Sequence, residues 1–261
     1  MPEADFYADP FIYDVLHAPG TSDDVSALLR IVRRHLKVTS QLTFLEPACG
    51  SGRYLIALSR KGYSCTGFDL LAPMVQYAAA RAKELQSPAE FFVADMRTFT
   101  HGRKLKPMGV VFNLINSIRH LPGDAALVEH LREVTRVLAP DGVYIVGISL
   151  CVYGIEDPCE DVWEGARDGT RVVQAVQYFP APGPQDRDER VVSHLTITDS
   201  LGRERHVDSN YVLYSYTRDE LEATVAAAGL RVKEWVSSDG RESLDPRGPG
   251  YVVAVLELST T

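Results

Sequence analysis

The 261-residue sequence predicts an α/β fold, in which a mostly parallel sheet carries helices on both faces and an antiparallel β layer is inserted. Three observations predict this. Strand-like and helix-like runs alternate from residue 42 to residue 150. From residue 151 to residue 216, strand-like runs follow one another without a helical period. One helix and two strands then complete the pattern toward residue 258.

The first part of the chain supplies five strands and their helices. An amphipathic helix is expected over 23–36, because its apolar residues recur at helical spacing. We expect strands at 42–46, 64–70, 89–95, 108–114 and 143–150, and helices at 53–62, 72–85 and from Asp124 to Pro140. Pro73 suits the first turn of its helix. Asp124 is expected to be an N-cap, and Pro140 is expected to end that helix.

The second part inserts a β layer and then closes the main sheet. Strands are expected at 170–179, 190–199 and 205–216, separated by turn-rich segments. Thr217 and Glu220 form a capping box that starts the last helix. Two further strands at 231–236 and 250–258, paired as a hairpin, bring the main sheet to seven strands.

The composition argues against several classes of protein. The net charge of −8 disfavours nucleic acid or an anionic membrane as a partner. No apolar run approaches the ~20 residues that span a bilayer, and the acidic N-terminus is unlike a signal peptide. The four cysteines form no CxxC pair, so we expect no disulfide framework, no metal site and a reducing cytoplasm.

The segment LEPACGSGR, at 45–53, follows the first strand and is rich in small residues. Small residues there allow a ligand to approach the backbone, and the next helix directs free N–H groups at it. No lysine follows Gly52, so the segment is not a P-loop. A dinucleotide fingerprint needs a third glycine, but Leu55 stands there.

Three segments, LEPACGSG at 45–52, GFDL at 67–70 and VADM at 93–96, resemble the motifs of class I S-adenosylmethionine-dependent methyltransferases. Ala48 replaces the first glycine of that family's loop. The resemblance implies a Rossmann-like sheet and S-adenosyl-L-methionine as cofactor. Asp69 would bind the ribose hydroxyls, and Asp95 with Met96 would bind the adenine. The full set of cofactor-binding residues implied is Tyr13, Glu46, Ala48, Gly50, Arg53, Asp69, Leu70, Asp95, Met96 and Asn113.

The segment LAPDG, at 138–142, resembles the family's turn before the fifth strand. Asp141 stands for a glycine of that turn, and an Asp tolerates the left-handed conformation expected there. The domain plan that follows has four parts: an N-terminal helical segment over the cofactor (1–40), the cofactor-binding core (41–150), the inserted lid over the acceptor (151–216) and the completion of the sheet (217–261).

The methyl acceptor is less well defined by the sequence. The loop after the fourth strand lacks the motifs of base, catechol and protein-arginine methyltransferases. His120 in that loop is the candidate catalytic base, and the alternative is that it caps the following helix. We expect the other histidines to lie mostly on the surface. Tyr7 and Tyr13 are lid candidates. The expected substrate-binding residues are Tyr7, Asn116, Arg119, Trp163 and Tyr214, and the roof could also use Arg171, Tyr178, His194, Tyr211 and Tyr216.

The sequence therefore predicts a cytoplasmic, metal-independent methyltransferase that modifies an N or O atom of a small molecule. Its architecture resembles that of glycine and amino-sugar N-methyltransferases. Two alternatives stay open: a methyltransferase acting on protein or RNA, and a regulatory protein that binds the cofactor without turnover. A homodimer is possible.

Overall fold

The computed structural model describes residues 7–37 and 41–259. Within these ranges the main sheet has eight strands in the order β11-β10-β12-β5-β4-β1-β2-β3. Their bounds are β1 Thr43–Pro47, β2 Ser64–Asp69, β3 Glu90–Val93, β4 Met108–Asn113, β5 Leu138–Leu150, β10 Leu230–Val236, β11 Ser243–Leu244 and β12 Gly250–Leu258. The strands β1 to β5 run parallel, whereas β12 lies antiparallel to β5 and β10.

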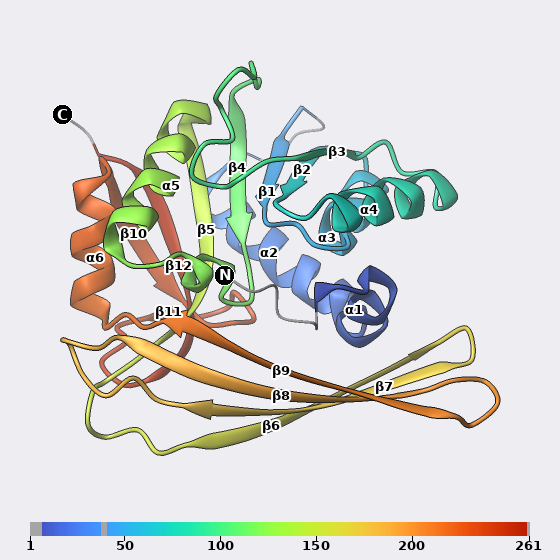
Figure 1. Cartoon of the computed structure of the whole chain (residues 1–261). Coiled ribbons are helices and arrows are strands. Elements are labelled where there is room, and N and C mark those ends of the chain that lie inside the picture. The colour runs from blue at the N-terminus through green and yellow to red at the C-terminus, as the bar shows by residue number, and fades with distance from the viewer. Residues whose placement is uncertain (1–6, 38–40, 260–261) are drawn as a thin grey trace.

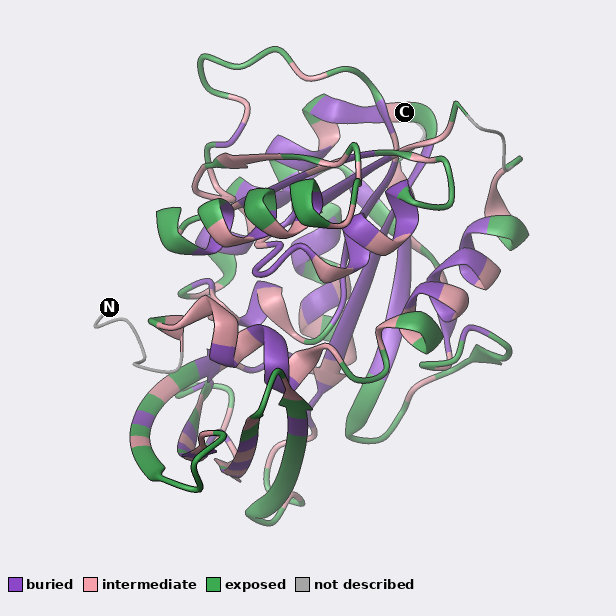
Figure 2. Ribbon diagram, turned by 90° about the vertical axis from the view of Figure 1, so that its right-hand side faces the viewer, coloured by how far each residue is buried: buried purple, intermediate pink, exposed green. Residues whose placement is uncertain are grey.

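Helices cover both faces of the main sheet (Figure 1). The helices of the described residues are α1 Pro10–His17, α2 Thr21–His35, α3 Arg53–Ser59, α4 Ala72–Glu84, α5 Asp124–Val137 and α6 Arg218–Ala227, with a short 3-10 helix, η2, at Ser117–His120. Side chains alternate between the two faces of a strand, so Phe44 packs with α2 and α3 and Leu45 packs with α5 and α6. Figure 2 shows these central strands as continuously buried.

A second sheet lies across the carboxyl ends of the parallel strands, and α1 lies between the two sheets (Figure 1). In the described residues it has four antiparallel strands: β6 Cys159–Arg167, β7 Thr170–Phe179, β8 Asp188–Thr198 and β9 Glu204–Tyr214. Buried and exposed residues alternate along β7 to β9, as the bands in Figure 2 show. One face of this sheet therefore packs on the body of the protein and the other faces solvent.

The predicted fold class is confirmed, with corrections to the number of strands. The main sheet has an eighth, two-residue strand, β11, at its edge. The inserted layer has a fourth strand, β6, which the prediction missed. Six consecutive residues at the start of β6 are exposed, so both faces of this stretch are solvated and the sequence lacks the alternation by which strands are predicted.

Two local predictions around α5 were wrong. The N-cap is Gly123, and Asp124 is instead the first helical residue, with its carboxylate bound to Arg187. Pro140 and Asp141 do not form a left-handed turn: the helix ends at Val137, and β5 runs from Leu138 through both residues. The capping box of Thr217 and Glu220 is confirmed.

Candidate active site

The cofactor motif forms the turn from β1 to α3. Ala48, Gly50 and Gly52 have φ angles of 50°, 52° and 71°, all in the left-handed region. A Cβ at Gly52 would lie 2.6 Å from Cε1 of Phe91, and one at Gly50 would lie 3.0 Å from Cε1 of Tyr13. The two glycines are therefore needed both for the backbone conformation and for close packing.

Asp69 lies at the end of β2, directly beside this turn. Its Oδ2 accepts the N–H of Gly50 at 2.9 Å, and its Oδ1 accepts the N–H of Leu71 at 3.0 Å. Burial raises the pKa of Asp69, and these N–H groups oppose the rise. Each carboxylate oxygen keeps a second lone pair that can accept a ligand hydroxyl. Leu70, which follows, exposes 64% of its surface and offers an apolar contact beside that position.

A pocket lies where the strand order reverses, between the carboxyl ends of β1 and β4. Its lining includes Tyr13, Glu46, Ser51, Arg53, Leu114 and Ser117. Glu46 is only 5% exposed, and burial raises its pKa well above the usual value. Among the described residues, neither Oε2 of Glu46 nor Oγ of Ser51 has a hydrogen-bond partner. Buried polar atoms without partners fit a polar ligand group placed in this pocket.

Arg53 enters the same pocket from the first turn of α3. Its Nη1 donates to Oγ1 of Thr21 at 2.8 Å and lies 3.2 Å from Oδ2 of Asp24, and its Nη2 donates to the hydroxyl of Tyr54. These contacts tie α2 to the cofactor turn. Its predicted role in binding the cofactor stays a prediction.

The ends of β3 and β4 carry the other predicted cofactor residues. Arg97 pairs with Asp95 at 2.7 Å, and its hydrogen bonds lower the pKa of that carboxyl. The carbonyl of Met96 lies 3.0 Å from Nδ1 of His130. Asn113 is buried: its amide donates to the carbonyl of Pro47 and its oxygen accepts the hydroxyl of Tyr144. Asn113 thus touches the cofactor turn through the backbone of β1.

Aromatic rings gather where α1, η2 and β9 meet. The hydroxyl of Tyr7 lies 3.2 Å from Nε2 of His120, and the imidazole stacks on Tyr211 with ring centroids 5.6 Å apart. Tyr13 lies 5.8 Å from Tyr7 and 4.4 Å from His17 by ring centroids. This aromatic cluster extends from Tyr13, whose ring packs on Gly50, to His120.

His120 is neutral in this setting. Burial among these rings, with Arg119 adjacent, lowers its pKa to about 4. The N-cap of α5 is Gly123, the N-terminus of the helix has no side-chain cap hydrogen bond, and the ring contacts of His120 are with Tyr7 and Tyr211. The geometry therefore does not support the capping role. Whether His120 acts as a base stays a prediction.

The other predicted acceptor residues lie around this cluster rather than within it. Arg119 is 3% exposed, donates to the carbonyl of Tyr214 at 3.1 Å and pairs with Glu189 at 3.2 Å, and so joins η2 to the second sheet. Asn116 bonds with Ser149 through both its amide groups. Trp163 lies on β6, 6.0 Å from His17 by ring centroids.

The second sheet directs only part of the predicted roof toward the cluster. Tyr211 faces His120, whereas the neighbouring Tyr214 packs near Arg187 and Tyr216. Arg171 and His194 are exposed and bond to Glu164 and Asp208 of the same sheet, and Tyr216 lies in the core of the main sheet. Arg171, His194 and Tyr216 therefore do not face the aromatic cluster.

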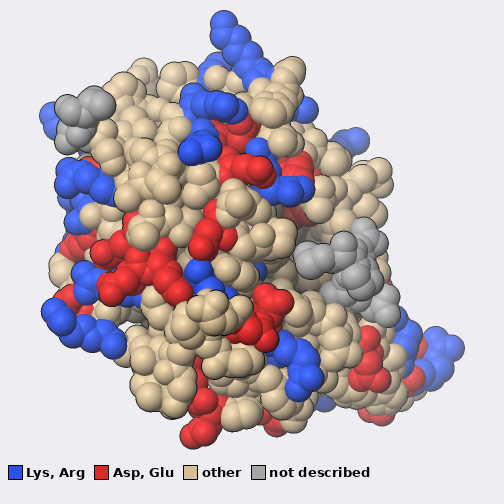
Figure 3. All heavy atoms as spheres, turned by 60° about the vertical axis from the view of Figure 1, so that its left-hand side comes forward, with Lys and Arg blue, Asp and Glu red and all other residues tan. Residues whose placement is uncertain are grey.

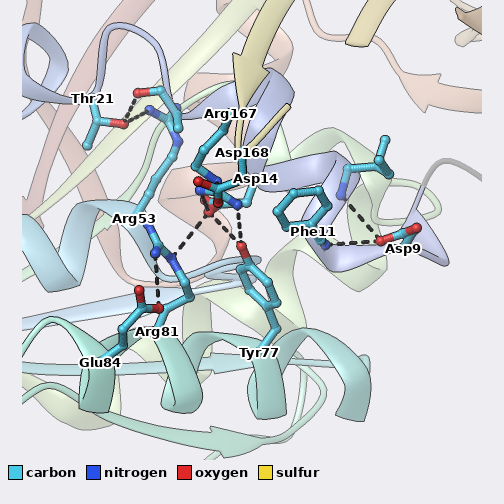
Figure 4. Close-up of polar contacts among 12 residues, drawn as sticks. Asp9, Phe11, Asp14, Thr21, Arg53, Tyr77, Arg81, Glu84, Arg167 and Asp168 are labelled. Atoms are coloured by element: carbon cyan, nitrogen blue, oxygen red, sulfur yellow. Dashed lines mark hydrogen bonds and ion pairs between the residues drawn. The ribbon is translucent and has the colours of Figure 1, made fainter. Parts of the chain in front are cut away.

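A buried carboxylate holds α1 in place (Figure 4). Asp14 is 3% exposed and binds Arg167 of β6 and the hydroxyl of Tyr77 of α4, with Nε of Arg81 3.6 Å away. A charge this deeply buried is stable only when it is paired. These contacts fix α1 against α4 and β6, and so fix where Tyr13 lies.

Two histidines were missed by the sequence prediction. His130 is fully buried, although the histidines were expected mostly on the surface. It lies on the apolar stripe of α5 with Leu127, Leu131 and Val134, and that spacing was a usable signal. His17 packs one turn after Tyr13 on α1, and burial lowers its pKa to about 3. Among the described residues, no His, Cys, Asp or Glu cluster could hold a metal, and no helix could cross a membrane.

Comparisons with known proteins agree with this geometry. A family model described as a methyltransferase domain matches residues 44–142. The chain is 28% identical over 236 residues to a dTDP-3-amino-3,6-dideoxy-alpha-D-glucopyranose N,N-dimethyltransferase of Streptomyces fradiae, covering 89% of this chain and 88% of that protein. It is 27% identical to a dTDP-3-amino-3,4,6-trideoxy-alpha-D-glucopyranose N,N-dimethyltransferase of Streptomyces venezuelae, with 85% and 90% covered.

The fold is also shared with a solved structure. An amino pentose methyltransferase from Micromonospora echinaspora, involved in calicheamicin biosynthesis and determined with S-adenosylmethionine bound, superposes with a TM-score of 0.66 at 20% identity. The match covers 93% of this chain and 94% of that one. At 20% identity, this similarity shows that the two proteins share a fold.

Proposed function

We propose that this chain, a class I S-adenosylmethionine-dependent methyltransferase that acts on small molecules, methylates the amino group of a hydroxylated acceptor such as a nucleotide-linked amino sugar. The cofactor supplies an electrophilic methyl group on a positively charged sulfur atom. The protein has to hold it, orient an acceptor nitrogen beside it and exclude water.

The residues of the pocket fit this cofactor. We propose that Glu46, whose Oε2 has no hydrogen-bond partner among the described residues, binds its ammonium group and that Asp69 binds its ribose hydroxyls. Leu70 and Met96 would flank the adenine, which is apolar on both faces.

The observation that carries the acceptor class is the neutral aromatic cluster of Tyr7, His120 and Tyr211. An amine attacks through its lone pair and needs no base before attack, whereas an alcohol needs a base whose pKa lies near the working pH. An imidazole whose pKa is about 4 is a weak base but accepts an N–H hydrogen bond. The cluster is therefore better suited to orient a neutral amine than to ionise an alcohol.

The shape and charge of the protein favour a small acceptor over a macromolecule. The second sheet and α1 cover the carboxyl ends of the parallel strands, so we propose that residues of the insert wall the acceptor site. Acidic and basic side chains are interspersed on the face shown in Figure 3, and the net charge is −8. A nucleic acid would require a basic surface. All four cysteines are free thiols, which supports the cytoplasm as the compartment.

The test is methyl transfer with matched acceptors. The purified chain is incubated with S-adenosylmethionine and one of three dTDP-sugars that carry an amino, a hydroxyl or a methylated amino group at the same carbon. We expect products heavier by one or two methyl groups with the amine, further methylation of the methylated amine, and no product with the alcohol. Product from the alcohol alone, or labelling only of added protein or RNA, would overturn the proposal.

A further inference from the structure

A chain of buried polar groups runs between the two ends of the cofactor site. The amide of Asn113 donates to the carbonyl of Pro47, at the start of the cofactor turn. The hydroxyl of Tyr144 lies 2.7 Å from Oδ1 of Asn113 and 2.8 Å from Nε2 of His130. Nδ1 of His130 lies 3.0 Å from the carbonyl of Met96, in the loop that follows β3. Five segments of the chain thus meet through one line of contacts.

The carbonyl of Pro47 fixes which group donates and which accepts along this chain of hydrogen bonds. A carbonyl only accepts, so the Asn113 nitrogen must face Pro47 and its oxygen must face Tyr144. Tyr144 then donates to Asn113, and its oxygen can accept from Nε2 of His130. The carbonyl of Met96 likewise requires a proton on Nδ1. Both ring nitrogens of His130 therefore face groups that call for an N–H donor.

A neutral imidazole carries only one N–H. Burial lowers the pKa of His130 to about 4, with the Met96 carbonyl and Asp95 opposing, so the ring is neutral near pH 7. Its single N–H can donate either from Nδ1 to the carbonyl of Met96 or from Nε2 to the hydroxyl of Tyr144. The tautomer of His130 decides which side of the network is bonded.

Helix α5 also binds the loop after Met96 at a second position. One turn beyond His130, Oε2 of the buried Glu133 accepts both the backbone N–H and the hydroxyl of Thr100, at 2.8 and 2.5 Å. The helix α5 therefore holds both ends of the segment 96–100, next to Asp95. Neither Glu133 nor His130 lines the pocket at the β1–β4 switch point.

We propose that His130 is a positioning residue for the cofactor site, which through Tyr144 and Asn113 couples the loop at Met96 to the turn at Pro47. The proposal rests on the cofactor site, not on the identity of the acceptor. The network holds Met96 and Pro47, which lie beside the two ends of the proposed cofactor site, in one arrangement before the cofactor binds. Loss of the network lets these two segments move independently, which weakens cofactor binding.

The test removes one atom from the middle of the network. Tyr144→Phe keeps the buried ring but leaves His130 and Asn113 without their shared partner. Calorimetry with S-adenosylhomocysteine should show binding about tenfold weaker than in the wild-type protein. The matched control is Thr224→Val in α6, which also removes a buried hydroxyl that donates at 2.8 Å to a backbone carbonyl. It should bind within about twofold of the wild type.

An unchanged dissociation constant in Tyr144→Phe, or an equal loss in Thr224→Val, would overturn the proposal. If Tyr144→Phe does not fold, the wild-type protein labelled with nitrogen-15 histidine provides a second test. Addition of S-adenosylhomocysteine should shift the ring nitrogen signals of His130 as one tautomer gains over the other, and unmoved signals would contradict the coupling. Failure of the wild-type protein to bind S-adenosylhomocysteine would instead remove the methyltransferase function itself.

Discussion

The proposed cofactor side and the proposed acceptor side of this site are built in different ways. The cofactor side uses short contiguous segments at the ends of adjacent parallel strands, where Gly50 and Asp69 are already bonded to each other. The acceptor side joins residues from distant parts of the chain: Tyr7 meets His120 across 113 positions, and Tyr211 completes the cluster. The first arrangement follows from strand order, whereas the second depends on how α1 and an inserted sheet pack.

The difference separates two kinds of mutational effect. Changes on the cofactor side should alter affinity for any ligand that contains adenosine and methionine, whatever the acceptor. Changes on the acceptor side should leave that affinity intact. Four predictions test this separation.

Asp69→Ala should have the largest effect. It removes a charged acceptor for the ribose hydroxyls and the partner of the Gly50 N–H. Hydrogen bonds to a charged group contribute roughly 1.5–3 kcal/mol, so calorimetry should show S-adenosylmethionine affinity about 10- to 100-fold lower. Asp208→Ala, on the exposed face of the second sheet, is the control and should bind normally. Unchanged affinity in Asp69→Ala would mean that the cofactor does not use the end of β2.

His120→Asn should change the response of stability to pH. In the wild-type protein the unfolded state binds a proton on this ring below about pH 6.5, and the folded state does so only near 4. Folding stability therefore falls as the pH drops from 6.5 to 4, and His120 contributes a slope of up to about 1.4 kcal/mol per pH unit. Urea unfolding at pH 7 and pH 5 should show a shallower loss in His120→Asn.

Equal slopes in the two proteins would show that His120 is not buried as a neutral ring. The same variant should keep its affinity for S-adenosylmethionine and lose turnover at saturating acceptor, because His120 belongs to the acceptor side. An increase in the acceptor's Michaelis constant with unchanged turnover would mean that the ring only helps to bind the acceptor.

Tyr211→Ala tests the wall formed by β9. It should weaken binding of the acceptor by about tenfold, or roughly 1.4 kcal/mol, while the affinity for S-adenosylmethionine stays within about threefold of the wild type. Tyr214→Ala is a matched control on the same strand, because Tyr214 packs near Arg187 and not against His120. Steady-state kinetics on both variants gives the comparison. A larger loss of acceptor binding in Tyr214→Ala than in Tyr211→Ala would contradict the proposed orientation of this sheet.

Ala48→Gly should have the smallest effect. Ala48 has a φ of 50°, where a residue with a Cβ is strained by about 1–2 kcal/mol, and glycine relieves this at an entropic cost of roughly 0.5–1 kcal/mol. A rise in unfolding free energy of up to about 1 kcal/mol is expected in urea unfolding. Gly50→Ala, its opposite, should destabilise the turn because its Cβ meets Tyr13. A loss of stability in Ala48→Gly would show that the turn is not strained.

The parts of the fold and site that could be predicted are those with local causes. The segment around Gly50 and the acid at Asp69 have fixed positions relative to their strands, and repeating apolar spacing identified β1 to β5. The strand β6 could not be predicted in this way, because six consecutive residues at its start are exposed and the stretch has no alternating pattern. The sequence prediction chose Tyr214 for the acceptor site and gave Tyr211 only as a possible roof residue, because the register of β9 decides which ring faces His120.

The position of Tyr13 has a consequence for how this protein can diversify. Its ring packs on Gly50 of the cofactor turn, and the same ring lies beside His17 and beside Tyr7 of the proposed acceptor side. A substitution in α1 that admits a new acceptor therefore also disturbs the cofactor. Laboratory evolution toward other acceptors should accumulate its changes in β9, which does not line the cofactor pocket, and should leave α1 nearly untouched.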